Sequence, residues 1–155
     1  MFNPESFLNQ TSEQALSTQL DPVPEGDFKA VSQAITKESV RSFDINKGER
    51  AGQKGFSLNV AWKIDDEAAG EYNNRMVFQT LFLDVTSDGA GLDFGKGKNV
   101  DLGKLRAALG QNQDGQPWAP SMLGSQVAIV QVKQEVDKND SSKIHSKVKG
   151  VASLN

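Results

Sequence analysis

Apolar and polar residues alternate through the middle of the chain, most clearly in "FSLNVAWKID", residues 56–65. One face of this extended segment carries only apolar side chains: Phe56, Leu58, Val60, Trp62 and Ile64. A period of two with one apolar side is typical of a strand that buries one face. The pattern therefore predicts that Trp62 faces the core, although its ring could also stack on a nucleic-acid base.

The segment "RMVFQTLFLDV", residues 75–85, is apolar on both faces. One face carries aliphatic side chains around Gln79, and the other carries Phe78 and Phe82, four residues apart. Aliphatic side chains suit a narrow core, whereas phenylalanines on one strand face suit a platform on which bases stack. The two rings could equally pack under a loop or in a subunit interface.

Three further strands and one helix follow from the same reasoning. The strands are "DFKAVSQAITK", with a shift of face after Ala30 that would align Val31 with Ile35, "SQVAIVQVKQEV" and "KIHSKVKGVAS". The helix is "NVDLGKLRAALG", with Asn99 or Asp101 as N-cap and Gly110 as its C-terminal stop.

This order predicts an all-β domain: a five-stranded OB-fold-like barrel with a long loop between strands one and two and a helix between strands three and four. Periodicity does not establish closure, so a sandwich or an open sheet also fits. Residues 1–25 are expected to form a loose acidic N-terminal arm, and residues 26–155 the OB-like nucleic-acid-binding domain.

Composition excludes several kinds of chemistry. The chain has no cysteine, which rules out disulfides, thiol nucleophiles and cysteine-bound zinc. No phosphate-binding loop occurs, and the single histidine, His145, has no evident acidic or serine partner. We therefore expect a protein that is not an enzyme and uses no cofactor or metal. Without a signal peptide or an apolar run of roughly 18 residues, it should stay in the cytoplasm, away from membranes.

Charge is unevenly distributed along the chain. Residues 1–27 contain acids and no Lys or Arg, whereas residues 37–54 contain five basic side chains against three acids. Binding of single-stranded nucleic acid needs cations for phosphates and aromatic faces for bases. The candidate nucleic-acid-binding residues are Lys37, Arg41, Phe43, Lys47, Arg50, Lys54, Lys63, Tyr72, Arg75, Phe78 and Phe82. Phe43 and Tyr72, expected to be exposed, could instead anchor their loops.

The runs "VPEGDFKAVSQAI", "NNRMVFQTLFLDV", "LGKLRAALG" and "MLGSQVAIVQVKQEV" resemble the phage-encoded single-stranded DNA-binding proteins of OB-fold type. The resemblance spans about residues 22–150 and implies coating of single-stranded DNA during phage DNA replication or recombination in the host cytoplasm. It assigns contacts to Arg75 and Phe78, with Lys63 beside them. Many such proteins end in an acidic tail, whereas this chain is acidic at its N-terminus. The arm is therefore expected to recruit replication or recombination proteins, or to compete with DNA.

Two alternatives stay open at this point. A protein-binding or structural assembly module would use the arm and the apolar face of residues 75–85. A single-stranded RNA-binding protein would use the same groove, because only the 2′-hydroxyl distinguishes the two ligands. The sequence also leaves open whether the chain forms a homo-oligomer.

Overall fold

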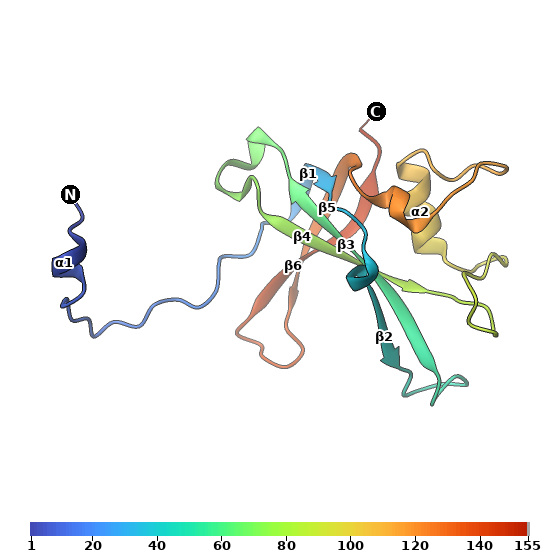
Figure 1. The fold of residues 1–155 in the computed structure, drawn as a ribbon, viewed down its shortest axis with the longest axis horizontal. Coiled ribbons are helices and arrows are strands. Elements are labelled where there is room, and N and C mark those ends of the chain that lie inside the picture. Colours follow the sequence, from blue (N-terminus) through green and yellow to red (C-terminus); the bar gives the residue numbers. More distant parts are fainter. Residues whose placement is uncertain (155) are drawn as a thin grey trace.

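The protein is rich in antiparallel β-strands, as a computed structural model describing residues 1–154 shows (Figure 1). The strands are β1 Gly26–Ser32, β2 Val40–Asp44, β3 Lys54–Ile64, β4 Met76–Leu83, β5 Val127–Val136 and β6 Ile144–Ala152. The α-helices are α1 Pro4–Phe7 and α2 Val100–Ala108, and short 3-10 helices span η1 Lys37–Ser39, η2 Glu67–Tyr72 and η3 Pro120–Leu123. The predicted β-rich class is confirmed.

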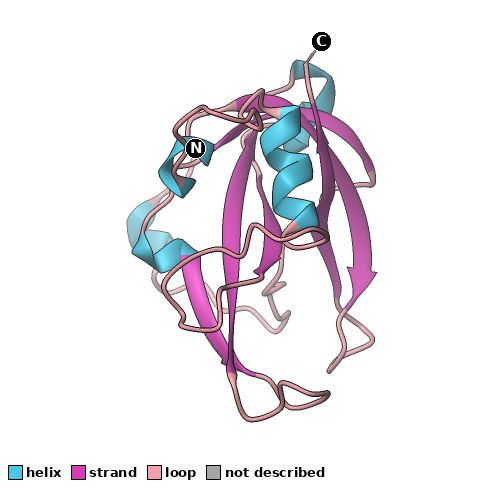
Figure 2. Cartoon of the chain, turned by 90° about the vertical axis from the view of Figure 1, so that its right-hand side faces the viewer, coloured by secondary structure: helices cyan, strands magenta, loops and turns pink. Residues whose placement is uncertain are grey.

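All six strands belong to one sheet, in which β3 is central. One edge of β3 pairs with β2 and then with β1, its other edge pairs with β4, and the order continues from β1 through β5 to β6. Within residues 1–154 no strand pairing joins β4 to β6, so the sheet is not a closed barrel. Helix α2 packs against both of these strands (Figure 2).

The predicted five strands and long loop are wrong, because residues 37–54 contain a sixth strand. Strand β2 pairs with the start of β3, from Val40 opposite Leu58 to Asp44 opposite Lys54. All five β2 residues are exposed, so the strand carries no alternation of buried and exposed positions. The turn between β2 and β3 contains Gly52 at φ 88°, a conformation that glycine adopts without strain.

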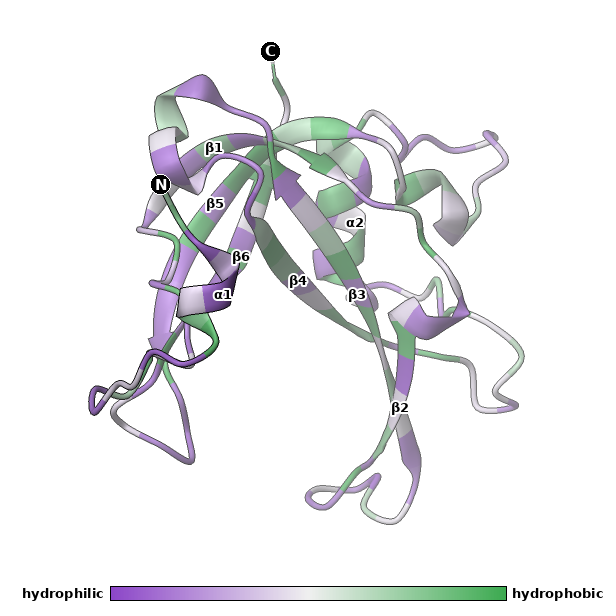
Figure 3. Ribbon diagram, turned by 60° about the vertical axis from the view of Figure 1, so that its left-hand side comes forward, coloured by the Kyte–Doolittle hydropathy of each residue, from purple (hydrophilic) through white to green (hydrophobic). Residues whose placement is uncertain are grey.

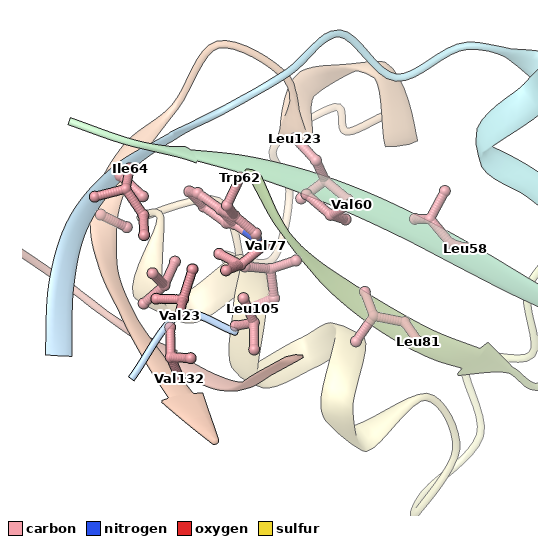
Figure 4. Close-up of a cluster of buried hydrophobic side chains, with 14 of the residues drawn as sticks. Val23, Leu58, Val60, Trp62, Ile64, Val77, Leu81, Leu105, Leu123 and Val132 are labelled. Atoms are coloured by element: carbon pink, nitrogen blue, oxygen red, sulfur yellow. The ribbon is translucent and has the colours of Figure 1, made fainter. Parts of the chain in front are cut away.

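The core lies between the inner faces of the sheet, α2 and η3 (Figure 4). Trp62 is fully buried, which confirms the predicted core position, and its Nε1 donates to Oε1 of Gln79 at 3.1 Å. Val77 and Leu81 are buried on the inner face of β4, as the pattern predicted. The shift of face predicted for the first strand does not occur, because Ser32 is buried in step with Ala30.

Helix α2 matches the predicted helix, but Asn99 serves it differently from a side-chain cap. Asn99 has φ 52° and makes no capping hydrogen bond; instead its side chain binds the backbone of Asp84 and Asp93. Gly110, at φ 71°, follows the helix as expected. No helix within residues 1–154 has the length and apolar character needed to cross a membrane.

The N-terminal segment has two parts. Residues 1–20 are exposed throughout, and α1 lies away from the body (Figure 1). The chain then joins the body: Val23 is fully buried, and its carbonyl accepts a hydrogen bond from the side chain of Gln134 at 3.1 Å. Residues 21–25 therefore form a docked segment, which leads directly into β1.

Candidate nucleic-acid interface

The side of the sheet that points away from the core carries three exposed phenylalanines. Across β3 and β4, Ala61 pairs with Phe78 and Ser57 pairs with Phe82. Because successive side chains alternate between faces, these residues point opposite to Trp62 and Val77. We call this surface the outer face; its principal side chains are Arg41, Phe43, Lys63, Met76, Phe78 and Phe82.

The phenylalanines of the outer face are exposed because the inner face of β4 already fills the core. Phe78 is 53% exposed and Phe82 is 69% exposed, whereas Val77 and Leu81 beside them are buried. Exposed aromatic groups with charged neighbours often mark a binding surface. Strand β4 therefore has an aliphatic core face and an exposed aromatic face, one of the two arrangements that the sequence left open.

Strand β2 extends the outer face beyond β3. Phe43, 38% exposed, pairs with Gly55 in the register of the hairpin, and its ring lies against that glycine. The ring also meets Phe82 edge-on, with centroids 5.8 Å apart and planes at 88°. Aromatic edge contacts of this kind are favourable, so the pair is held in place on the surface.

Replacement of Gly55 by alanine tests this arrangement, because a methyl group there would overlap the Phe43 ring. We expect the ring to leave Phe82 and the free energy of unfolding to fall by about 0.5–1.5 kcal/mol, the usual worth of an aromatic pair. Ring-to-ring NMR contacts and urea unfolding measure the two effects. Gly91→Ala, where an added methyl meets nothing, is the control. A Gly55→Ala protein that keeps the Phe43–Phe82 contact would refute the proposed packing.

Basic side chains surround the aromatic part of the outer face. Arg41 pairs with Ser57 from β2, and Lys63 lies opposite Met76 at the other end. A shallow depression of about 220 Å³ beside Phe78 is lined by Arg41 and also by Glu38. Within residues 1–154, no ion pair engages the predicted binding residues Lys37, Arg41, Lys47 and Lys63. Their charges are therefore available to phosphates.

Lys54 and Arg50, on the β2–β3 hairpin, lie apart from the outer face. Lys54 shares the parity of Trp62 on β3, so it points to the opposite side of the hairpin, where its Nζ is 2.5 Å from the Asp44 carboxylate. Arg50 lies in the turn and donates to the side chain of Gln53 at 3.1 Å. Both residues line a separate groove with the loop that follows β4.

The expectation that Tyr72 is an exposed aromatic is wrong, because η2 folds the tip of the β3–β4 connection back. Tyr72 is half-buried against the core, and the charge of Glu71, followed by burial, raises its pKa. The Arg75 guanidinium lies 5.9 Å from the Tyr72 ring centroid and donates to the backbone carbonyl of Asp21 at 2.8 Å. In the structure Arg75 therefore holds the N-terminal segment against the body.

The expectation that His145 has no acidic partner is also wrong. The β5–β6 hairpin brings its Nε2 to 2.5 Å from Oδ2 of Asp137, and this hydrogen bond is the main cause of a lowered Asp137 pKa. On the same hairpin Lys147 pairs with Glu135 at 2.8 Å. Asp137 and His145 are 8 residues apart in the sequence, and the pairing of β5 with β6 brings their side chains together.

The exposed residue Phe94, in the loop before α2, is an aromatic that the sequence reasoning did not select. It is 79% exposed and lies outside the outer face. The loop that carries Phe94 has no alternation of apolar and polar residues, so no sequence pattern marked this residue as a binding candidate.

Comparison with known proteins finds no protein-family model and no curated protein that matches this chain.

Proposed function

We propose that the protein binds single-stranded DNA with little sequence preference through its outer face. The observation that carries the proposal is the row of exposed rings of Phe43, Phe78 and Phe82, flanked by Arg41 and Lys63. Every base has a π-face, so stacking on phenylalanine tolerates any sequence. Phosphate neutralisation by lysine and arginine is equally independent of sequence.

The strand connectivity supports an OB-type sheet with β2 as an added strand. Strand β1 pairs with both β3 and β5, β3 pairs with β4, β5 pairs with β6, and a helix follows β4. The OB-fold has five strands in a partly open barrel and binds oligonucleotides on a strand face between its loops. The β2–β3 and β5–β6 hairpins extend from the same side of the body (Figure 3), as the walls of such a groove would.

In this proposal the protein positions the strand and performs no chemical step. Bases rest on Phe78 and Phe82, while Lys63 and Arg41 neutralise phosphates. The resemblance of the sequence to phage single-stranded DNA-binding proteins extends the proposal to the coating and protection of DNA exposed during phage replication or recombination.

Titration with oligo-dT, oligo-rU and duplex DNA at two salt concentrations tests the proposal. We expect tight binding of oligo-dT that weakens as salt rises, and weak binding of the duplex, whose bases are not free to stack. Tighter binding of oligo-rU than of oligo-dT would reassign the ligand to RNA. Binding of none of the three at low salt would contradict the proposal.

A second candidate function is protein binding through residues 1–20. This segment is exposed and carries Phe2 and Phe7, whose rings lie 5.1 Å apart, together with exposed leucines. Exposed apolar side chains on an acidic segment suit a docking peptide. Self-association or partner capture that is insensitive to salt and lost on deletion of residues 1–20 would favour this function.

A further inference from the structure

A second basic groove opens on the other side of the β2–β3 hairpin. It measures about 650 Å³ and lies between the start of β3 and the loop of residues 84–99, which faces the viewer in Figure 2. We call it the hairpin groove; the residues used below are Arg50, Lys54, Phe56, Val85, Thr86 and Lys98. The sequence reasoning assigned Arg50 and Lys54 to the same surface as Phe43, whereas the structure separates them.

The charge of the hairpin groove is favourable to phosphates. Lys54 is engaged by Asp44, but Arg50 and Lys98 have no ion pair within residues 1–154. One carboxylate, that of Asp93, also lines the groove, and its Oδ1 accepts a hydrogen bond from the backbone N–H of Gly95 at 2.8 Å. The half-buried ring of Phe56 adds an aromatic surface.

The wall of the hairpin groove is a built structure. Asn99 accepts from the backbone N–H of Asp84 and donates to its carbonyl, both at 2.8 Å, and donates to the carbonyl of Asp93 at 3.0 Å. Val85 and Leu92 form a β-bridge across the same loop. These contacts hold Asn99 and Asp93 close to Asp84, the residue that follows β4. The backbone of Lys98, which precedes Asn99, is therefore fixed near the end of β4.

The outer face and the hairpin groove meet at the end of β4. Phe82 is exposed on the outer face, and Val85, three residues further along the chain, lines the groove. Three residues span at most about 10 Å of extended chain. A strand stacked on Phe82 therefore leaves the outer face close to the opening of the groove.

We propose that a bound single strand continues around the end of β4 into the hairpin groove, where Arg50 and Lys98 bind its phosphates. This inference rests on the proposed function and extends its site. The outer face binds a short strand by itself, and the groove adds affinity only for a longer strand. Sites on comparable folds range from about 4 to about 16 nucleotides, so the two surfaces together fit within the known range.

Oligo-dT of about 6 and about 16 nucleotides separates the two surfaces. The test variant is the double substitution Arg50→Ala with Lys98→Ala. The control is Lys96→Ala with Lys104→Ala, which removes the same charge from exposed positions that do not line the groove. We expect the test variant to bind the 6-mer like the wild type, and to bind the 16-mer about 10-fold more weakly. Its salt slope on the 16-mer should be shallower by about 1–2.

The outcomes distinguish this inference from the proposed function. The inference is overturned if the wild type binds the 6-mer, and the test and control variants lose equal affinity for the 16-mer. It is also overturned if the wild type gains no affinity between the two lengths. A wild type that binds neither oligonucleotide at low salt contradicts the proposed function itself, and the inference falls with it.

Discussion

Replacement of both Phe78 and Phe82 by alanine should weaken oligo-dT binding by about 2–6 kcal/mol, because each base stacked on an aromatic ring contributes about 1–3 kcal/mol. Both rings are more than half exposed, so the free energy of unfolding should fall by no more than about 1.5 kcal/mol, the worth of the lost Phe43–Phe82 contact. The salt slope should stay the same, because no cation is removed. Fluorescence anisotropy at several salt concentrations and urea unfolding measure these quantities.

Phe94→Ala is the matched control for the double variant. Phe94, at 79%, is more exposed than either of those rings, but it lies on the loop before α2 and outside the outer face. It should bind oligo-dT like the wild type. Equal losses in the control and in the double variant would mean that the outer face is not a stacking platform.

Replacement of Trp62 by alanine should lower the free energy of unfolding by about 3–5 kcal/mol, the cost of removing a large buried aromatic. Trp62 is fully buried, and its loss would also leave Oε1 of Gln79 without its donor inside the core. Urea unfolding, followed by circular dichroism because the substitution removes a fluorophore, measures the loss.

Trp62→Phe separates the structural role of this residue from a binding role. This variant keeps an aromatic ring in the core but removes the N–H that Gln79 accepts, so stability should fall by about 1–3 kcal/mol. Its affinity for oligo-dT should match that of the wild type under conditions where both are folded. A large loss of affinity with unchanged stability would show that Trp62 contacts the ligand.

The sequence was sufficient where burial alternates along a strand. Trp62 falls in step with four other apolar residues, and that period alone assigned it to the core. In β4 the chemical difference between aliphatic and aromatic positions was enough to separate the core face from the exposed face. Helix α2 could be predicted equally well, because the spacing of its buried leucines and the glycine after its end are local sequence signals.

The sequence was insufficient where pairing partners decide the structure. Strand β2 is exposed at every position, so its strand conformation depends on the edge of β3 and leaves no burial pattern to read. The side chains of Phe43 and Lys54 point to opposite faces of the β2–β3 hairpin, and this could not be predicted without knowing that β2 is a strand. The contacts of Arg75 with Asp21 and of His145 with Asp137 likewise depend on strand pairing or on the docked N-terminal segment.

The most direct test of the central claim is the affinity of the wild-type protein for oligo-dT as salt is raised. Within residues 1–154, the outer face offers two unpaired cations beside its rings, Arg41 and Lys63, so for an oligo-dT too short to reach the hairpin groove the logarithm of the association constant should fall with the logarithm of salt concentration at a slope of about −1.4. Binding at low salt with this slope supports the claim. Absence of binding at low salt would contradict it.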